Sequence, residues 1–201
     1  MRRFYTREAY LDLVNEIRTK IPQIALSTDV IAGFCGETED EFKDTISLLE
    51  TVKFDMAYLF AYSMREKTHA YHQLKDDVSQ EDKKRRLAWM IDVFRKYSLE
   101  VMKKEVGTYQ IVLIENEHRK DKNKLVGRTD TNKLVILDNI KVKGDLNKIG
   151  NDEEMTFGDY VMVKITSCST TTMYGDAMCK IKRMKDFFIL SNGNPYINNL
   201  I

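Results

Sequence analysis

The sequence predicts two parts of different fold class, an α/β part followed by a small antiparallel β-barrel of OB-like kind. Helical and strand patterns alternate from Arg7 to Tyr62, which is typical of parallel strands covered by helices. After Gly107 the pattern changes to short strands separated by glycines. We therefore expect an α/β part over residues 1–106 and a barrel over residues 107–185. The asparagine-rich remainder of the chain is assigned no role.

Capping and spacing signals place the predicted helices. Apolar residues recur at helical spacing over residues 7–20. Thr38 and Glu41 stand three residues apart and predict a capping box, in which each side chain binds the backbone N–H of the other. A long helix is predicted over residues 80–105, and its basic run at 83–86 is interpreted as a solvated helix face.

Two apolar runs, at residues 24–32 and 54–62, predict buried strands. Gly33 and Gly36 bracket the turn that follows the first of them. Loops of this kind, between a strand and the helix after it, hold ligands in barrels and open sheets. The segment from 62 to 77 is polar and is predicted to be a loop.

The predicted barrel consists of short strands with glycines between them. The expected strands cover residues 109–115, 124–128, 133–137, 160–166 and 172–182, with a polar insertion at 139–151.

Composition limits the classes of function. The net charge is +1, so nucleic-acid binding would have to come from local basic patches. No apolar run is long enough to span a bilayer, and Arg2-Arg3 is not followed by the apolar core of a signal peptide, so we expect no membrane partner. Cys35, Cys168 and Cys179 are far apart and lack metal-ligand spacing, which favours structural roles in a reducing compartment.

Four segments carry a resemblance to a known family: Arg3–Tyr10, Ser27–Phe42, Phe60–His72 and Leu125–Thr129. Together they resemble the MiaB-type tRNA methylthiotransferases, which are radical S-adenosylmethionine (SAM) iron–sulfur enzymes. The final barrel is similar to the TRAM domain of that family. The resemblance implies that residues 1–106 form a partial (β/α) barrel, the C-terminal part of a radical SAM core. It implies a TRAM domain over 107–185, and leaves a tail at 186–201 of unknown role.

Two features resemble the eukaryotic, mitochondrial branch of the family. Cys35 stands where bacterial members usually carry proline, and the run over residues 60–78 has the eukaryotic form. The resemblance implies methylthiolation of N6-isopentenyladenosine next to the anticodon, with tRNA and SAM as partners. It also implies a mitochondrial location, and a cytoplasmic one is the alternative because no transit peptide is visible. The oligomeric state is not indicated.

The chain departs from the family in its cysteines. Family members hold two 4Fe-4S clusters, one through three cysteines of an N-terminal domain and one through a CxxxCxxC motif, and neither set occurs here. We therefore expect the C-terminal half of such an enzyme, inactive alone, with no catalytic and no metal-binding residue of its own. One alternative is a stand-alone tRNA-binding module without catalysis. Another is an unrelated α/β enzyme that uses Cys35 as a nucleophile.

Asp29, Ile31 and Gly33 are the predicted cofactor-binding residues. Side chains alternate along a strand, so the three share one face. The resemblance implies a Gly-x-Ile-x-Gly pattern that packs beside SAM, in which Ile31 and Gly33 fill the second and third places. Asp29 stands where the first glycine would be. Ordinary barrel packing followed by a tight turn explains the same residues.

Lys124, Arg128, Asn132 and Lys133 are the predicted RNA-binding residues. Arg128, Asn132 and Lys133 lie around a strand-to-strand turn, and Lys124 ends the lysine-rich segment at 120–124 that precedes them. Such a basic surface binds phosphates, which is the role that the resemblance implies for a TRAM domain. A solvated loop is the alternative meaning of a lysine run.

Overall fold

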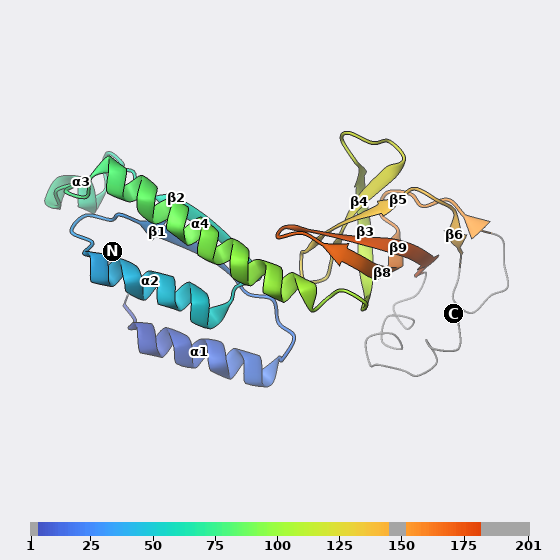
Figure 1. The fold of residues 1–201 in the computed structure, drawn as a ribbon, viewed down its shortest axis with the longest axis horizontal. Helices are drawn as coiled ribbons and strands as arrows, with labels where there is room; N and C mark the ends of the chain where they lie inside the picture. Colours follow the sequence, from blue (N-terminus) through green and yellow to red (C-terminus); the bar gives the residue numbers. More distant parts are fainter. Residues whose placement is uncertain (1–3, 145–151, 182–201) are drawn as a thin grey trace. The chain divides into compact units, whose positions relative to one another are not determined.

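The computed structural model describes residues 4–144 and 152–181, and the chain divides into two compact units after Val101 (Figure 1). Unit 1 is the part up to Val101, and unit 2 begins at Met102. The predicted tail at 186–201 and the second half of the predicted insertion lie outside the described residues. Within the described ranges, none of the helices combines the length and apolar character that a membrane crossing requires.

Unit 1 alternates helices with two parallel strands, as predicted. Strands β1 and β2 pair in register from Ser27 opposite Met56 to Ala32 opposite Ala61. The elements are α1 (Arg7–Lys20), β1 (Ser27–Ala32), α2 (Glu39–Val52), β2 (Met56–Ala61), α3 (His69–Gln73) and α4 (Gln80–Lys103). The prediction of a loop over 62–77 is wrong at α3, a single turn that forms because the Thr68 hydroxyl accepts a hydrogen bond from the Tyr71 N–H.

One face of the two-stranded sheet packs against helices. Val30, Ala32 and Leu59 point to this face, where residues of α1, α2 and α4 complete a single core. Figure 1 shows α2 and α4 in front of the strands. The buried members are Val14, Ala32, Phe42, Ile46, Leu49, Val52, Phe54 and Met90. On the other face of the strands Asp29, Tyr58 and Phe60 are exposed, so within the described residues of unit 1 this side of the sheet is open.

Helix α2 begins with the predicted capping box. The Thr38 Oγ1 accepts a hydrogen bond from the Glu41 N–H at 3.3 Å, and the Glu41 carboxylate accepts one from the Thr38 N–H at 2.8 Å. Both bonds satisfy backbone donors that a helix start otherwise leaves without a partner. The cap fixes where the helix starts and so sets the length of the loop after β1.

We expect Thr38→Ala to lower the free energy of unfolding by about 1 kcal/mol, because the side-chain acceptor of the cap is lost. Thr45→Ala is the matched control on the same helix, since Thr45 is half-buried and its hydroxyl donates to the Glu41 carbonyl within the helix, not to a cap. Urea unfolding followed by circular dichroism measures both. Equal destabilisation by the two changes would contradict a specific role for the cap.

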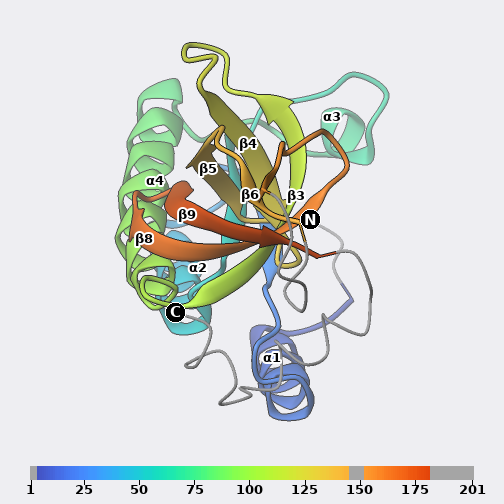
Figure 2. The same ribbon diagram turned by 90° about the vertical axis from the view of Figure 1, so that its right-hand side faces the viewer.

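Unit 2 is a closed β-barrel with a short additional ribbon. Its strands are β3 (Tyr109–Glu117), β4 (Lys124–Thr129), β5 (Leu134–Asp138), β6 (Val142–Lys143), β7 (Asp152–Glu153), β8 (Tyr160–Cys168) and β9 (Thr172–Lys180). The order β5-β4-β3-β8-β9 is closed by pairing of β5 with β9 (Figure 2). Strand β6 falls in the region predicted as a polar insertion, where Val142 is buried in the barrel core and β6 pairs with β9.

The prediction of an antiparallel barrel is wrong at the closing pair, because β5 and β9 are parallel. The other neighbouring pairs in the ring are antiparallel. The physical reason is the number of strands, because a closed ring of five strands cannot alternate direction all the way round. The core is formed by inward residues, of which the fully or nearly fully buried ones include Val112, Ile114, Leu125, Val135, Leu137, Val161, Val163, Ile165 and Met173.

Candidate functional site

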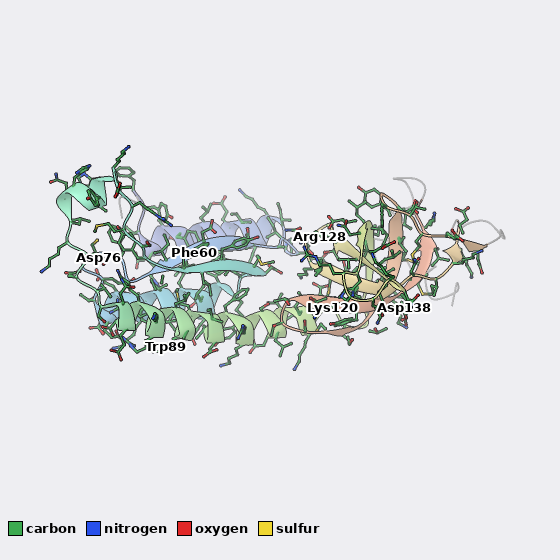
Figure 3. All side chains as sticks on the ribbon, turned by 90° about the horizontal axis from the view of Figure 1, so that it is seen from above. Phe60, Asp76, Trp89, Lys120, Arg128 and Asp138 are labelled. Atoms are coloured by element: carbon green, nitrogen blue, oxygen red, sulfur yellow. The ribbon has the colours of Figure 1, made fainter. Side chains whose placement is uncertain are left out.

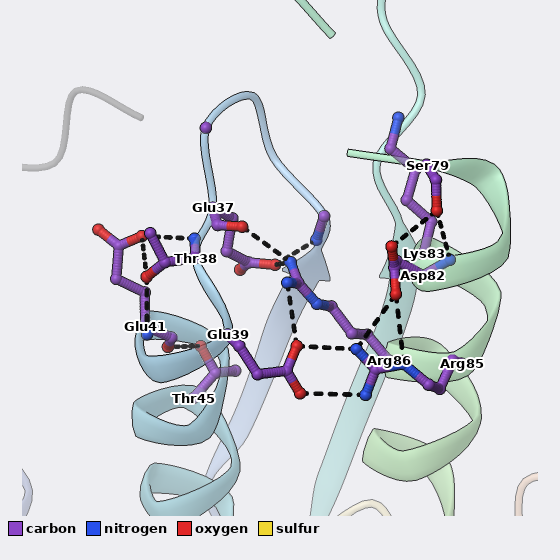
Figure 4. Close-up of polar contacts among 12 residues, drawn as sticks. Glu37, Thr38, Glu39, Glu41, Thr45, Ser79, Asp82, Lys83, Arg85 and Arg86 are labelled. Carbon is purple, nitrogen blue, oxygen red and sulfur yellow. Dashed lines mark hydrogen bonds and ion pairs between the residues drawn. The ribbon is translucent and has the colours of Figure 1, made fainter. Parts of the chain in front are cut away.

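The loop between β1 and α2 is held by charged residues of α4 (Figure 4). Arg86 is only 5% exposed, and its Nη1 donates to the Glu37 Oε2 at 2.7 Å and to the Glu37 carbonyl at 3.1 Å. The same Glu37 oxygen accepts a hydrogen bond from the Gly33 N–H at 2.6 Å. One buried guanidinium and one carboxylate therefore fix both ends of the loop.

Lys83 holds the neighbouring part of the chain. Its side chain is fully buried, its Nζ lies 2.5 Å from the Asp76 Oδ1, and it stands over the Tyr62 ring at 5.3 Å from the centroid. The predicted solvated face at 83–86 is therefore wrong for Lys83 and Arg86. The three-residue spacing puts both on the face of α4 that meets the core, where carboxylates from other segments pair with them.

Glu39 and Arg85 form an exposed pair beside this buried cluster. The two Arg85 Nη atoms donate to the two Glu39 carboxylate oxygens at 3.0 and 2.7 Å. These hydrogen bonds, with a further contribution from Arg86, lower the pKa of Glu39 from 4.5 to about 2. The pKa of Arg85 is raised by the same contact.

The lowered pKa of Glu39 predicts a pH dependence of stability. A carboxyl group whose pKa is lower in the folded state stabilises the fold above its unfolded pKa, and this contribution is lost as the pH falls toward the folded value. We expect the melting temperature of the native chain to exceed that of Glu39→Gln at pH 6 and the difference to shrink between about pH 4.5 and 2. Thermal unfolding of both proteins across this range is the measurement. A difference that does not change with pH would contradict the assignment.

Asp29 and Ile31 lie on the open face of the sheet. They alternate with the core residues Val30 and Ala32, and the parallel register puts Asp29 opposite Tyr58 and Ile31 opposite Phe60. Tyr58 and Phe60 are both about half exposed; Figure 3 labels Phe60 on its strand. The sequence prediction missed these two aromatic residues, although strand alternation combined with parallel pairing indicates them.

We call Ile31, Tyr58 and Phe60 the open apolar face. The exposed apolar surface of these adjacent side chains is suited to contact with a flat or aliphatic ligand, and SAM has parts of both kinds. Asp29 is exposed beside it and can accept hydrogen bonds. Contact of Asp29 and Ile31 with a cofactor stays a prediction.

Gly33 does not fit a cofactor in the same way. It is buried with a φ of +78°, and a Cβ built on it would come within 2.5 Å of the Lys83 Cγ. The space that the absent side chain leaves is therefore filled by Lys83 of the same chain. Cofactor contact by Gly33 stays a prediction, and packing against Lys83 accounts for the glycine without a ligand.

The described residues offer no ligand set for an iron–sulfur cluster. Among residues 4–144 and 152–181, no group of three or more histidine, cysteine, aspartate or glutamate side chains is arranged to hold a metal ion. Cys35, Cys168 and Cys179 form no disulfide with one another.

Three of the predicted RNA-binding residues, Arg128, Asn132 and Lys133, lie at the β4–β5 turn of the barrel, and Figure 3 labels Arg128. Arg128 points outward, and its Nη1 donates to the carbonyl and the side-chain oxygen of Asn132, both at 3.1 Å. Its Nε lies 3.3 Å from the Glu115 carboxylate. Lys124, also on β4, lies 3.7 Å from the Asp138 carboxylate, and this pair is solvent-exposed.

Lys133 has a different position from the other three. Its side chain is 7% exposed, and its Nζ donates to the Glu105 Oε1 at 2.7 Å. Such a buried ion pair holds the start of β5. RNA binding by Lys133 stays a prediction, and it would require the contact with Glu105 to break.

Two further cations border this part of the barrel. The loop 118–123 joins the first and second strands of the ring, and β4 and β5 are the second and third strands. In OB-like barrels this face and this loop bind oligonucleotides. Arg119 and Lys120 are exposed on the loop and have no ion-pair partner among the described residues. The lysine run had indicated Lys120 but not Arg119.

Comparisons with known proteins agree with the sequence prediction. A family model described as TRAM domain matches residues 103–178. The mitochondrial tRNA methylthiotransferase CDK5RAP1 of Homo sapiens is 48% identical over 180 residues, which are 90% of this chain and 30% of the human protein. The tRNA-2-methylthio-N(6)-dimethylallyladenosine synthase of Prosthecochloris aestuarii is 44% identical over 175 residues, which are 87% of this chain and 37% of that protein.

The apo form of Mycoplasma genitalium RNase R, a solved structure, is 12% identical over 53% of this chain and 19% of its own, with a TM-score of 0.31. That TM-score is too low to support an argument about fold. The chain spans about a third of the length of the curated relatives that it matches. The predicted resemblance is confirmed: over most of its length the chain is similar to proteins named tRNA methylthiotransferases, and residues 103–178 match the TRAM domain.

Proposed function

We propose that this chain is part of a tRNA methylthiotransferase that modifies N6-isopentenyladenosine next to the anticodon. The observation that carries the proposal is the 48% identity, over 90% of the chain, to a protein named mitochondrial tRNA methylthiotransferase. The TRAM domain supports tRNA as the partner. The names of the mammalian relatives support a mitochondrial location.

Within this function, residues 1–106 would be the C-terminal part of a radical SAM core. The parallel β1–α2–β2 unit and its open apolar face support this assignment, because the inner face of such a barrel must accept a cofactor. SAM, when bound, supplies the methyl group and the radical chemistry that an unreactive aromatic C–H bond requires. Ile31 would exclude water from its apolar part, and Asp29 would accept a hydrogen bond at the edge of the face. The two 4Fe-4S clusters would be held by residues other than those described.

The barrel over residues 107–185 would bind the tRNA. Lys124 and Arg128 point outward from β4, and Asn132 positions the Arg128 guanidinium through two hydrogen bonds. Exposed ion pairs are weak in water, so phosphates can replace Glu115 and Asp138 as partners of the two cations. This arrangement binds RNA backbone without reading its sequence.

The two alternatives are less well supported. A stand-alone tRNA-binding module would fit the barrel, but the relatives that match along both units are named as enzymes. A Cys35 nucleophile would need an adjacent base or an available cation. Its neighbour is the Tyr62 hydroxyl, and the nearby Lys83 is already paired with Asp76.

Deletion of the gene that encodes this chain tests the enzymatic proposal. Mass spectrometry of tRNA nucleosides should then show N6-isopentenyladenosine without its methylthio derivative, because the transferase would be absent. Reintroduction of the intact gene should restore the derivative. Persistence of the methylthio group after deletion would contradict the proposal.

Substitutions on the barrel test the RNA contacts in the purified chain. Lys124→Ala and Arg128→Ala should each weaken binding to tRNA. Each should also reduce the slope of log K against the logarithm of the salt concentration by the amount that corresponds to about one phosphate contact. Lys164→Ala is the control, since Lys164 is exposed on β8, outside the β4–β5 face. Fluorescence anisotropy at several salt concentrations gives both quantities. An unchanged slope in Lys124→Ala and Arg128→Ala would exclude these residues from the phosphate contacts.

A further inference from the structure

An apolar row crosses three strands on the outside of the barrel. Val126 of β4 is opposite Ile136 of β5, and Ile136 is opposite Tyr174 of β9. All three alternate with buried residues and so point outward. Strands lie about 4.8 Å apart, so the row extends over about 10 Å. Tyr174 is 39% exposed and presents the only aromatic ring in this row.

The row is flanked by the cations of the proposed RNA site. Lys124 and Arg128 stand two residues before and after Val126 on the same face of β4, about 7 Å away in each direction. Their ion pairs with Asp138 and Glu115 are exposed, so a phosphate can take the place of either carboxylate. Asp176 also points outward, two residues beyond Tyr174 on β9. Its carboxylate repels phosphates, so the RNA backbone would pass on the other side of Tyr174, near β4. The face thus combines cations near β4 with an aromatic ring on β9.

This combination matches the chemistry of unpaired nucleotides. Proteins that bind single-stranded RNA hold the backbone with cations and stack the bases on aromatic side chains. In a duplex the bases already stack on each other, so their faces are not available to a protein ring. The β4–β5 face is also the part of an OB-like barrel that is used for oligonucleotides.

We propose that Tyr174 stacks on an unpaired base of single-stranded RNA, with Val126 and Ile136 as the apolar floor beside it. Lys124 and Arg128 hold the adjoining phosphates. This inference rests on the proposed function, because it takes RNA to be the partner of the barrel. It adds that the bound RNA segment is single-stranded and that β9 contributes a base contact.

The test compares variants of the full chain for binding to a mixed-sequence single-stranded RNA of about ten nucleotides and to an RNA duplex of equal length. Tyr174→Ala should bind the single strand about tenfold more weakly, because one stacked base is lost. Tyr174→Phe keeps the ring and should stay within about twofold of the native chain. Tyr160→Ala is the matched control, since Tyr160 is an exposed tyrosine on β8 outside this row.

The salt dependence separates stacking from phosphate contact. Tyr174→Ala should leave the salt slope unchanged, whereas Lys124→Ala should reduce it. Native-like binding of the single strand by Tyr174→Ala would overturn the inference while leaving RNA binding intact. Equal losses in Tyr160→Ala, or an equal loss for the duplex, would also overturn it. If the native chain binds neither RNA, the proposed RNA-binding role itself fails together with this inference.

Discussion

Replacement of Arg86 by alanine is expected to lower the free energy of unfolding of unit 1 by about 3–5 kcal/mol. The Glu37 carboxylate is only 12% exposed, and Arg86 is its ion-pair partner. Without the guanidinium this carboxylate stays in a largely water-excluded place beside the Gly33 N–H. An uncompensated buried charge destabilises a fold more than the intact pair stabilises it.

The measurement uses the fluorescence of Trp89, the single tryptophan of the chain, during urea unfolding. Trp89 lies on α4 with its ring 5.6 Å from that of Phe42, so its signal reports the packing of unit 1. Arg85→Ala is the matched control, because Arg85 is the adjacent arginine but is 45% exposed and screened by solvent. Arg86→Ala combined with Glu37→Gln should recover part of the loss, since it removes the charge left behind. Similar losses in Arg85→Ala and Arg86→Ala would refute this account.

The elements of unit 1 could be predicted because their signals are local. Helix α1 ends where the sequence predicts, and the Thr38–Glu41 capping box is confirmed. The burial of Lys83 and Arg86 could not be predicted, because it depends on carboxylates contributed by other segments of the chain. Without knowledge of those carboxylates, a basic run on a helix predicts a solvent-exposed face.

The strands β3, β4, β5, β8 and β9 of the closed ring were also predictable, since each is a short run that polar turns delimit, whereas β6 lies in the segment predicted as a polar insertion. The closing contact between β5 and β9 was not, because it joins segments that are far apart in the sequence. The residues of the candidate RNA site were likewise only partly predictable from the sequence. Arg128 and Lys133 look equivalent in the sequence, yet one points to solvent and the other is paired with Glu105. Asn132 stands between them with a φ of +62°, which redirects the chain at the turn.

The second large effect is expected from Gly33→Ala. Its φ of +78° already disfavours any side chain by about 1–2 kcal/mol. The new Cβ would also stand 2.5 Å from the Lys83 Cγ, and Lys83 cannot move freely because its Nζ is paired with Asp76. Overpacking at such a site adds a further penalty of about 1–3 kcal/mol, so we expect a total loss of about 3 kcal/mol in the free energy of unfolding.

Gly36→Ala separates the two contributions, because Gly36 has a similar φ of +75° but no atom within 4 Å of a built Cβ. It should lose only the backbone part, about 1–2 kcal/mol. In the double variant Gly33→Ala with Lys83→Ala the clash is relieved, so the combined loss should be smaller than the sum of the single losses. Equal losses at Gly33 and Gly36, or additive losses in the double variant, would show that Lys83 does not fill the space beside Gly33. In that case the glycine would again be free to face a cofactor.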